Sequence, residues 1–196
     1  MSLLLIMEAL DSGKITLDTQ IPCSENAANM GGSQIWLDPR ETLSVNDMLK
    51  AIAVVSANDC VTAMAEYLGG TTDGFVKMMN DKAKNLGMEN TTFINSSGLE
   101  NDEKLGNTST AYDMALLMSY AIDNKTFVEI SGTKRHIATT NYKTYDWYNK
   151  NKLLTNYKYT IAGKTGFTKL ARRTLVTAAL KDDKKLVIVT LNDPDD

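Results

Sequence analysis

Apolar side chains recur every three to four residues through much of the first 130 positions, a spacing that predicts helices. After about residue 135 the pattern changes to short β-type runs separated by turns. The polar stretch 88–108 predicts a loop, and residues 14–43 predict irregular chain with short strand pieces. We expect helices at 2–12, 45–55, 59–68, 72–85, 110–122 and 125–130, and strands at 135–141, 157–164, 173–180 and 185–191.

Local signals support the ends of these helices. Ser44 is a candidate N-cap with Asp47 at the third helical position, and Ser109 is a candidate cap for the helix from 110. Gly69 and Gly87 follow the apolar runs and are typical of helix ends. A helical part (about 1–132) followed by a sheet part (about 133–196) predicts an α+β fold in one domain, with a helical lobe packed beside an antiparallel sheet.

Composition and charge exclude some functions. The net charge is −3, which argues against a nucleic-acid partner because phosphate binding needs clustered Lys and Arg. The one basic cluster, Lys169 with Arg172 and Arg173, is short and favours a local feature or a solvated face. No cofactor motif or metal-ligand spacing is present, so we expect neither a cofactor nor a metal.

The cysteines and the single histidine give weak signals. Cys23 and Cys60 lack any Cys-x-x-Cys pattern and favour small, half-buried side chains, with a disulfide left open. His136 is the only histidine, and its surroundings predict the start of a strand. A Ser-His-Asp site would therefore depend on this one residue, and we expect no catalytic role for it.

The first residues are apolar, yet the run from Leu3 to Met7 is too short to span a membrane. Glu8 follows at once and no basic segment precedes, so the pattern is not that of a signal peptide. A chain rarely begins inside the apolar face of a helix, so we expect Met1 to be an internal methionine with preceding sequence missing.

Two short motifs carry candidate chemistry. Ser-Ala-Asn at 56–58 lies between two predicted helices, where Ser and Asn most often act as caps. Lys-Thr-Gly at 164–166 lies at the end of a predicted strand, where Gly usually indicates a turn. Each motif is weak alone, but their order and setting match the motif set of penicillin-binding proteins and serine β-lactamases.

Further segments narrow this resemblance. Over nearly its whole length the chain resembles the serine D-alanyl-D-alanine carboxypeptidases, the low-molecular-mass penicillin-binding proteins of peptidase family S11. The matching segments lie at 30–37, 86–99, 109–115, 149–154 and 163–168. The resemblance implies a β-lactamase/transpeptidase-like fold and a hydrolase of the bacterial cell wall. Its expected partners are a peptidoglycan stem peptide ending in D-Ala-D-Ala and β-lactams as covalent inhibitors.

The resemblance implies catalytic roles for three residues. In this family a serine attacks the D-Ala–D-Ala bond, the terminal D-Ala leaves, and water hydrolyses the acyl-enzyme. The Ser56 hydroxyl would relay a proton, and the Asn58 side chain would hold the acyl part of the substrate. Lys164 would supply positive potential for the substrate carboxylate and support the proton relay.

It also implies a substrate-binding strand. The Thr165 hydroxyl would bind the substrate carboxylate, and Gly166 would leave room for the substrate backbone along the strand edge. The backbone N–H of Phe167 would be one of two oxyanion donors.

The sequence departs from the family at the nucleophile. No Ser-x-x-Lys precedes Ser56, and the only match, Ser131 to Lys134, lies after it and contains a glycine unsuited to a helix start. We therefore expect the family's motif just ahead of Met1 and no turnover by the chain as written. The family's flanking strands, signal peptide, C-terminal β domain and membrane anchor are also not visible. An extracytoplasmic, cell-wall or membrane-associated location therefore follows from the resemblance alone.

Two alternatives remain open at this point. A class A serine β-lactamase shares the fold, but it would need Asp where Ala57 stands and a separate Glu for deacylation. The second alternative is a non-catalytic peptidoglycan-binding or vestigial domain. The absence of a Ser-x-x-Lys motif before Ser56 supports it.

Overall fold

The computed structural model describes residues 1–101 and 103–194. Its helices are α1 (Ser2–Asp11), α2 (Glu25–Ala28), α3 (Val45–Val55), α4 (Asn58–Gly69), α5 (Thr72–Asn85), α6 (Ala111–Ala121), α7 (Lys125–Ser131) and α8 (Leu153–Asn156). Its strands are β1 (Gln20–Pro22), β2 (Thr42–Ser44), β3 (Arg135–Thr139), β4 (Thr144–Tyr148), β5 (Thr160–Thr168), β6 (Arg172–Lys181) and β7 (Lys184–Asp193).

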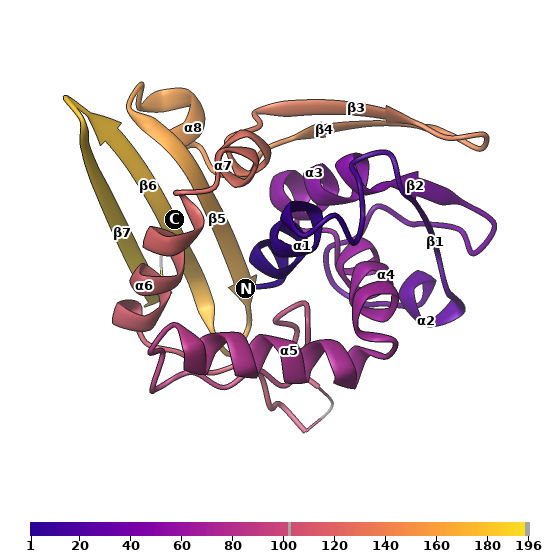
Figure 1. Ribbon diagram of the computed structural model, residues 1–196, viewed down its shortest axis with the longest axis horizontal. Helices are drawn as coiled ribbons and strands as arrows, with labels where there is room; N and C mark the ends of the chain where they lie inside the picture. Colours follow the sequence, from indigo (N-terminus) through magenta and orange to yellow (C-terminus); the bar gives the residue numbers. More distant parts are fainter. Residues whose placement is uncertain (102, 195–196) are drawn as a thin grey trace.

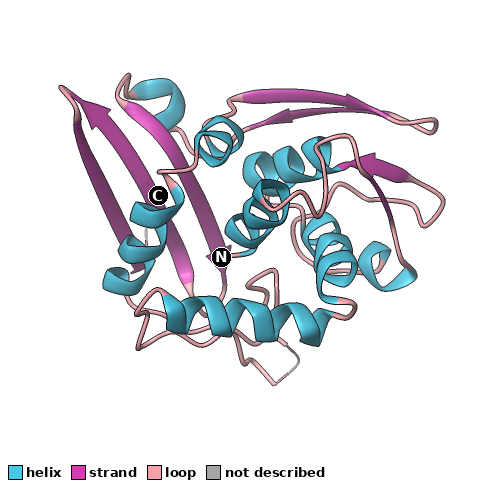
Figure 2. Cartoon of the chain, viewed as in Figure 1, coloured by secondary structure: helices cyan, strands magenta, loops and turns pink. Residues whose placement is uncertain are grey.

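The largest sheet and most of the helices occupy separate parts of the fold, as Figures 1 and 2 show. The strands β5, β6 and β7 form an antiparallel sheet on one side, with α6 against it, while α1, α3 and α4 form the centre of the helical part. The α+β prediction is therefore confirmed, with a helical lobe beside an antiparallel sheet.

Among the described residues the strands form three separate sheets rather than one. The order in the largest sheet is β5-β6-β7, while β1 pairs with β2 and β3 pairs with β4. The β3–β4 hairpin contacts α3 and extends away from the larger sheet (Figure 1). The sequence pattern misses β4, α2 and α8, because short elements carry too few residues to establish a period.

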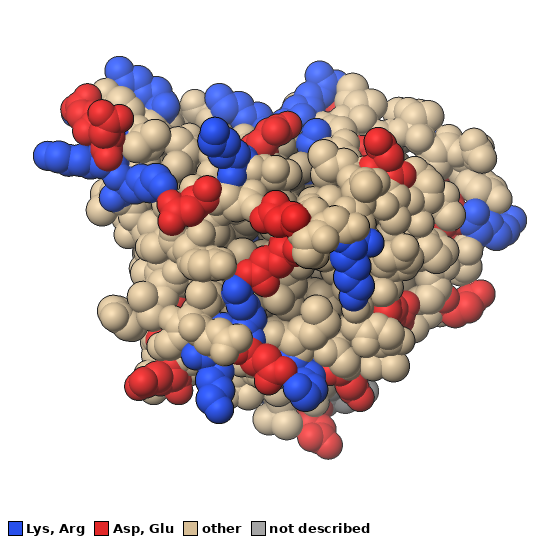
Figure 3. All heavy atoms as spheres, viewed as in Figure 1, with Lys and Arg blue, Asp and Glu red and all other residues tan. Residues whose placement is uncertain are grey.

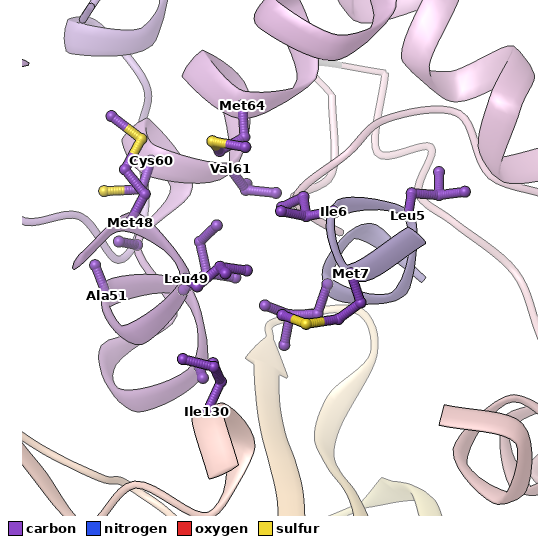
Figure 4. Packing of buried hydrophobic residues seen from close by; sticks show 14 of the residues in the cluster. Leu5, Ile6, Met7, Met48, Leu49, Ala51, Cys60, Val61, Met64 and Ile130 are labelled. Carbon is purple, nitrogen blue, oxygen red and sulfur yellow. The ribbon is translucent and has the colours of Figure 1, made fainter. Parts of the chain in front are cut away.

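The core lies where α1, α3, α4 and α7 meet. Ile6 of α1, Leu49 of α3 and Met64 of α4 are fully buried, and Figure 4 shows their side chains pointing toward one another. Seven of the ten residues of α1 are buried, so this helix is covered on most sides. Its burial holds α3 and α4 in a fixed relation, which matters because the candidate site lies at their junction.

The helix ends follow the predicted local signals with one shift. The Ser44 side chain accepts a hydrogen bond from the Asp47 N–H at 3.1 Å, which confirms the predicted cap of α3. At α6 the cap is Thr110 rather than Ser109, because the Thr110 hydroxyl accepts from the Asp113 N–H. The Ser109 hydroxyl instead lies 2.8 Å from the Thr91 hydroxyl. Thr91 belongs to the long loop that joins α5 to α6.

Charged side chains are mixed across the surface. On the face drawn in Figure 3, Lys and Arg alternate with Asp and Glu rather than gathering in one region. Within residues 1–101 and 103–194, no three His, Cys, Asp or Glu side chains group closely enough to hold a metal ion. No helix in these same ranges is both long and apolar enough to cross a membrane.

Both cysteines are buried free thiols, so the half-buried prediction underestimates how deeply they lie. Burial raises the pKa of the Cys23 thiol to about 11, and it also raises the pKa of Cys60 well above its usual value. These thiols are therefore side chains of the core with little thiolate character near neutral pH.

Candidate active site

The Ser-Ala-Asn motif forms the break between α3 and α4. Ser56 ends α3 in the left-handed conformation with φ +63°, and Asn58 is the first residue of α4. Ala57 is the N-cap of α4, which has no side-chain cap hydrogen bond. The capping interpretation of this motif is therefore wrong, and the Ser56 and Asn58 side chains remain available for other contacts.

Lys164 reaches this break from the sheet. It lies in the middle of β5, and its Nζ donates a hydrogen bond to the Ser56 hydroxyl. The same Nζ lies 2.6 Å from the Thr165 carbonyl oxygen. The tertiary fold thus brings together two motifs whose residues are far apart in the sequence.

The Lys164 amine is electrostatically perturbed. Burial lowers its pKa to about 8 from 10.5, and the positive charge of Lys150 adds to the shift. An ordinary lysine stays protonated at neutral pH, whereas a pKa near 8 allows proton exchange there. Ser56 and Lys164 therefore form a hydroxyl–amine pair suited to proton transfer.

Asn58 is held in place by the segment before α3. Its Nδ2 donates to the Gly31 carbonyl at 2.8 Å, and its backbone N–H donates to the Ser33 carbonyl at 2.8 Å. Between them, Gly32 has φ +74°, and a Cβ there would lie 2.7 Å from Asn58 Nδ2. Glycine is therefore required at 32 for both backbone conformation and space.

Lys150 is a site residue that the sequence analysis did not identify. Asn149 and Asn151 form a tight turn, because the Asn149 side-chain oxygen accepts from the Asn151 N–H at 2.9 Å. Between them, the Lys150 N–H donates to the Val54 carbonyl at 3.3 Å and its Nζ donates to the Ser33 hydroxyl at 3.1 Å. The Asn-x-Asn spacing drew attention to this segment, but nothing in the sequence indicated that the intervening lysine faces Lys164.

The strand carrying Lys164 has one free edge. In the part of the chain that the structure describes, β5 pairs only with β6, so its other edge presents unpaired backbone groups. Thr165 is half-buried, whereas Gly166 and Phe167 are exposed. Such an edge can accept an extended peptide as an added strand.

Gly166 also has a structural reason to be glycine. It lies opposite Thr174 of β6, and a Cβ at 166 would lie 2.5 Å from the Thr174 hydroxyl oxygen. The neighbouring Phe167 ring lies 5.2 Å from the Arg173 guanidinium, a cation–π distance. Arg173, one residue of the short basic cluster, thus packs on β5. This contact agrees with the expectation that the cluster is a local feature of the structure.

Glu100 ties the long loop to the end of β5. Its Oε1 accepts from the Thr168 hydroxyl and, at 3.2 Å, from the Leu170 N–H. The Thr168 hydroxyl in turn accepts from the Ala171 N–H at 2.9 Å. The sequence gives no signal for this contact, which fixes the turn after the Lys-Thr-Gly motif.

The remaining sequence candidates lie outside the site. His136 Nε2 is 2.6 Å from Asp47 Oδ1, so it forms a structural pair with α3. Ser131 is buried and donates to the Phe127 carbonyl at 2.7 Å, so it does not form a Ser–Lys pair with exposed Lys134.

Two cavities lie near these elements. One of about 120 Å³ is lined by the Lys-Thr-Gly residues together with Met114 of α6 and side chains of β6 and β7. The other, about 180 Å³, lies among α2, α4, the start of α5 and the long loop. Lys164 lines the smaller cavity, whereas Ser56 and Asn58 line neither of the two.

The sequence matches a known protein family and several of its members. The family model described as D-alanyl-D-alanine carboxypeptidase matches residues 1–195. The D-alanyl-D-alanine carboxypeptidase DacF of Bacillus subtilis is 42% identical over 190 residues, covering 96% of this chain and 48% of the relative. DacC of Escherichia coli is 35% identical, covering 94% of this chain and 46% of that protein. The chain thus spans about half the length of these curated relatives.

Solved structures agree with the sequence relatives. The D-alanyl-D-alanine carboxypeptidase DacD of Francisella tularensis superposes with a TM-score of 0.90 at 27% identity, covering 99% of this chain and 58% of that one. A Streptococcus pneumoniae structure described as a peptidoglycan synthesis regulatory factor (PBP3) gives a TM-score of 0.88 at 26% identity, with 100% and 58% coverage. The chain belongs to the D-alanyl-D-alanine carboxypeptidase family, and its fold is that of the penicillin-binding proteins.

Proposed function

We propose that this protein is a serine D-alanyl-D-alanine carboxypeptidase that removes the terminal D-Ala from peptidoglycan stem peptides through an acyl-enzyme. The observation that carries the proposal is the contact between Lys164 Nζ and the Ser56 hydroxyl beside a free strand edge. Relatives named D-alanyl-D-alanine carboxypeptidases support this substrate class.

In the proposed reaction, Ser56 and Lys164 move a proton. The Ser56 hydroxyl accepts a hydrogen bond from Lys164, so it can pass a proton toward the leaving amine of the substrate and recover one from Lys164. The lowered pKa of Lys164 supports this role, because the amine exchanges protons near neutral pH. Its positive form also attracts the terminal carboxylate of the substrate.

The substrate lies along β5 in this proposal. The peptide backbone pairs with the free strand edge, and the Thr165 hydroxyl binds the terminal carboxylate. The exposed Gly166 leaves space for the peptide, while the Phe167 N–H donates to the developing oxyanion. Asn58, held by Gly31 and Ser33, orients the acyl part from the opposite side.

The proposal assigns the nucleophilic serine to a Ser-x-x-Lys motif outside residues 1–196. The only such spacing in the sequence, Ser131 to Lys134, is disqualified because the Ser131 hydroxyl is buried and bonded within α7. Residues 1–196 then supply the proton relay and the substrate strand. The location that goes with this function is outside the cytoplasm, at the bacterial cell wall.

The decisive experiment is covalent labelling with a fluorescent penicillin, comparing the 196-residue chain with the full gene product. We expect labelling of the full product and none of the chain alone, with the labelled serine located by mass spectrometry. Ser56→Ala and Lys164→Met in the full product should slow acylation by about 10² to 10⁴, the usual contribution of positioned acid–base groups.

Other outcomes separate the alternatives. Label on Ser56 itself would make this residue the nucleophile and overturn the relay role. Rapid turnover of a chromogenic cephalosporin would indicate a β-lactamase. An unlabelled full product that still binds peptidoglycan would indicate a non-catalytic domain.

A further inference from the structure

Trp36 has an unusual backbone conformation for its residue type. Its φ is +62°, in the left-handed region that bulky side chains rarely adopt. Its side chain is nevertheless 71% exposed, while its neighbours Ile35 and Leu37 are buried. Burial of the indole therefore does not compensate for the backbone strain.

The strain itself has a structural cause. Asp59 is completely buried, and its Oδ2 accepts hydrogen bonds from the Ile35 N–H at 3.0 Å and the Leu37 N–H at 3.1 Å. Two N–H groups flanking one residue converge on a single oxygen only when that residue turns sharply, as the left-handed conformation of Trp36 allows. Asp59 thus explains the turn, but it does not explain the tryptophan.

Glycine would adopt this turn without the steric penalty of a Cβ. Tryptophan is neither buried nor conformationally favoured at this turn, and such a strained, exposed position points to a contact outside the chain. Exposed Trp residues are among those that contribute most often to binding surfaces.

Polar and aromatic residues lie close to Trp36, along the chain and in the turn between β3 and β4. Lys143 Nζ donates to the Trp36 carbonyl, and the adjacent Tyr142 is 53% exposed with its ring 5.3 Å from the Arg40 guanidinium. Arg40 also pairs with Asp38 at 2.7 Å. The surface patch made of Trp36, Asp38, Arg40 and Tyr142 therefore combines aromatic rings with balanced charges.

We propose that this patch binds the glycan strand of peptidoglycan, with the Trp36 ring stacking on an amino-sugar ring. The apolar face of a pyranose packs on an aromatic ring, and its hydroxyl and amide groups match the hydrogen-bonding side chains of Asp38 and Arg40. This inference rests on the proposed function, since it extends the same substrate from its peptide to its glycan.

The position and charge of the patch favour a glycan over a membrane. Ser33, whose carbonyl and hydroxyl contact Asn58 and Lys150, precedes Trp36 by three residues, a span of at most about 10 Å. A polymer bound at the site can therefore continue onto the patch. An anionic membrane would attract a cationic surface, whereas Arg40 is neutralised by Asp38 and the whole chain carries a net charge of −3.

Tryptophan fluorescence tests this proposal on the chain itself. The chain has only two tryptophans, and Trp147 is 6% exposed, so a change in solvent-exposed emission reports on Trp36. The probe is purified glycan strands freed of stem peptides, so that peptide binding at β5 is not measured. We expect a blue shift with the glycan and no shift with anionic phospholipid vesicles.

Retention on immobilised glycan strands gives the second measurement. Trp36→Gly should weaken retention by about tenfold or more while leaving the melting temperature equal or raised, because glycine relaxes the backbone. Tyr112→Ala, which removes another aromatic side chain that is 71% exposed, is the matched control and should retain parental binding.

Unchanged retention of Trp36→Gly, or a blue shift with vesicles but not with glycan, would overturn the proposal. Penicillin labelling of the full product distinguishes this failure from failure of the proposed function. If Trp36→Gly is still labelled by penicillin and still binds glycan as the parent does, the glycan-binding proposal is wrong and the proposed function stands.

Discussion

Lys164 Nζ donates a hydrogen bond to the Ser56 hydroxyl, although 108 positions separate the two residues in the sequence. The contact exists because the break between α3 and α4 faces the middle of β5. Lys150 lies on the same side and contributes to the lowered pKa of Lys164. The pair is therefore tuned by a third residue, from yet another segment.

Removal of the Lys150 charge should raise the pKa of Lys164 above its present value of about 8. Lys150→Met removes a nearby positive charge, so the protonated form of Lys164 is less destabilised and its pKa rises. The measurement is an NMR titration of ¹³C-methylated lysines, with the Lys164 resonance assigned from Lys164→Met.

The free energy of unfolding should change with pH as Lys164 titrates. The folded pKa of Lys164 lies below the unfolded value of 10.5, so the unfolded state binds more protons between about pH 8 and 10.5. Stability therefore rises with pH in this window, and the rise should shrink in Lys150→Met. Lys152→Met changes an exposed lysine of the same segment and should leave the Lys164 titration as it is. An unchanged Lys164 pKa in Lys150→Met would show that the Lys150 charge does not act on Lys164.

Gly32→Ala should impair the site more than it impairs folding. Both Gly32 and Gly70 have φ +74°, so alanine at either position strains the backbone and should lower stability. Only at 32 would the new Cβ lie 2.7 Å from Asn58 Nδ2, whereas nothing lies within 4 Å at 70.

Displacement of Asn58 by about 1 Å should slow penicillin acylation of the full gene product by up to about a hundredfold. Gly70→Ala is the control, which should also lose stability through backbone strain but keep parental acylation. Equal acylation rates for the two variants would show that the Asn58 position is not important for the reaction.

Glu41→Gln should destabilise the fold and remove part of its acid sensitivity. Burial alone would raise the pKa of Glu41, but hydrogen bonds from Thr140, the Asp38 N–H and Lys143 hold it below its usual value of 4.5. An acid with a lowered folded pKa contributes stability above its unfolded pKa and loses it as pH falls through the folded value.

The glutamine variant should therefore lose about 1–3 kcal/mol at neutral pH and show a weaker dependence below about pH 4.5. Urea denaturation at pH 7 and pH 3.5 gives both quantities, with exposed Glu89→Gln as the control. A loss of stability that is the same at both pH values would show that the Glu41 charge has no role.

Cys23 and Cys60 should react slowly with thiol reagents in the folded protein. Both are buried, and burial raises both pKa values, so neither presents an exposed thiolate at pH 8. Ellman's reagent should report almost no free thiol before denaturation and two after it. Rapid reaction of either cysteine in the native protein would show that its thiol is exposed to solvent.

Much of the helical part was predictable from local signals. The apolar spacing placed the long helices, and the Ser44–Asp47 pair located the start of α3 correctly. Local signals failed where a tertiary contact overrode them: the capping interpretation of Ser56 and Asn58 was wrong because these side chains face β5 and the Gly31 carbonyl.

The sequence by itself determined the fold class, the family and two of the motifs, because periodicity and motif order are properties of the chain read in one dimension. Only the tertiary structure decided which residues surround Lys164. Lys150, Glu100 and the turn around Trp36 take their roles from partners 22 to 117 residues away, in segments with no local signal. The electrostatic perturbation of a buried amine likewise depends on all the groups packed around it, and no single segment specifies it.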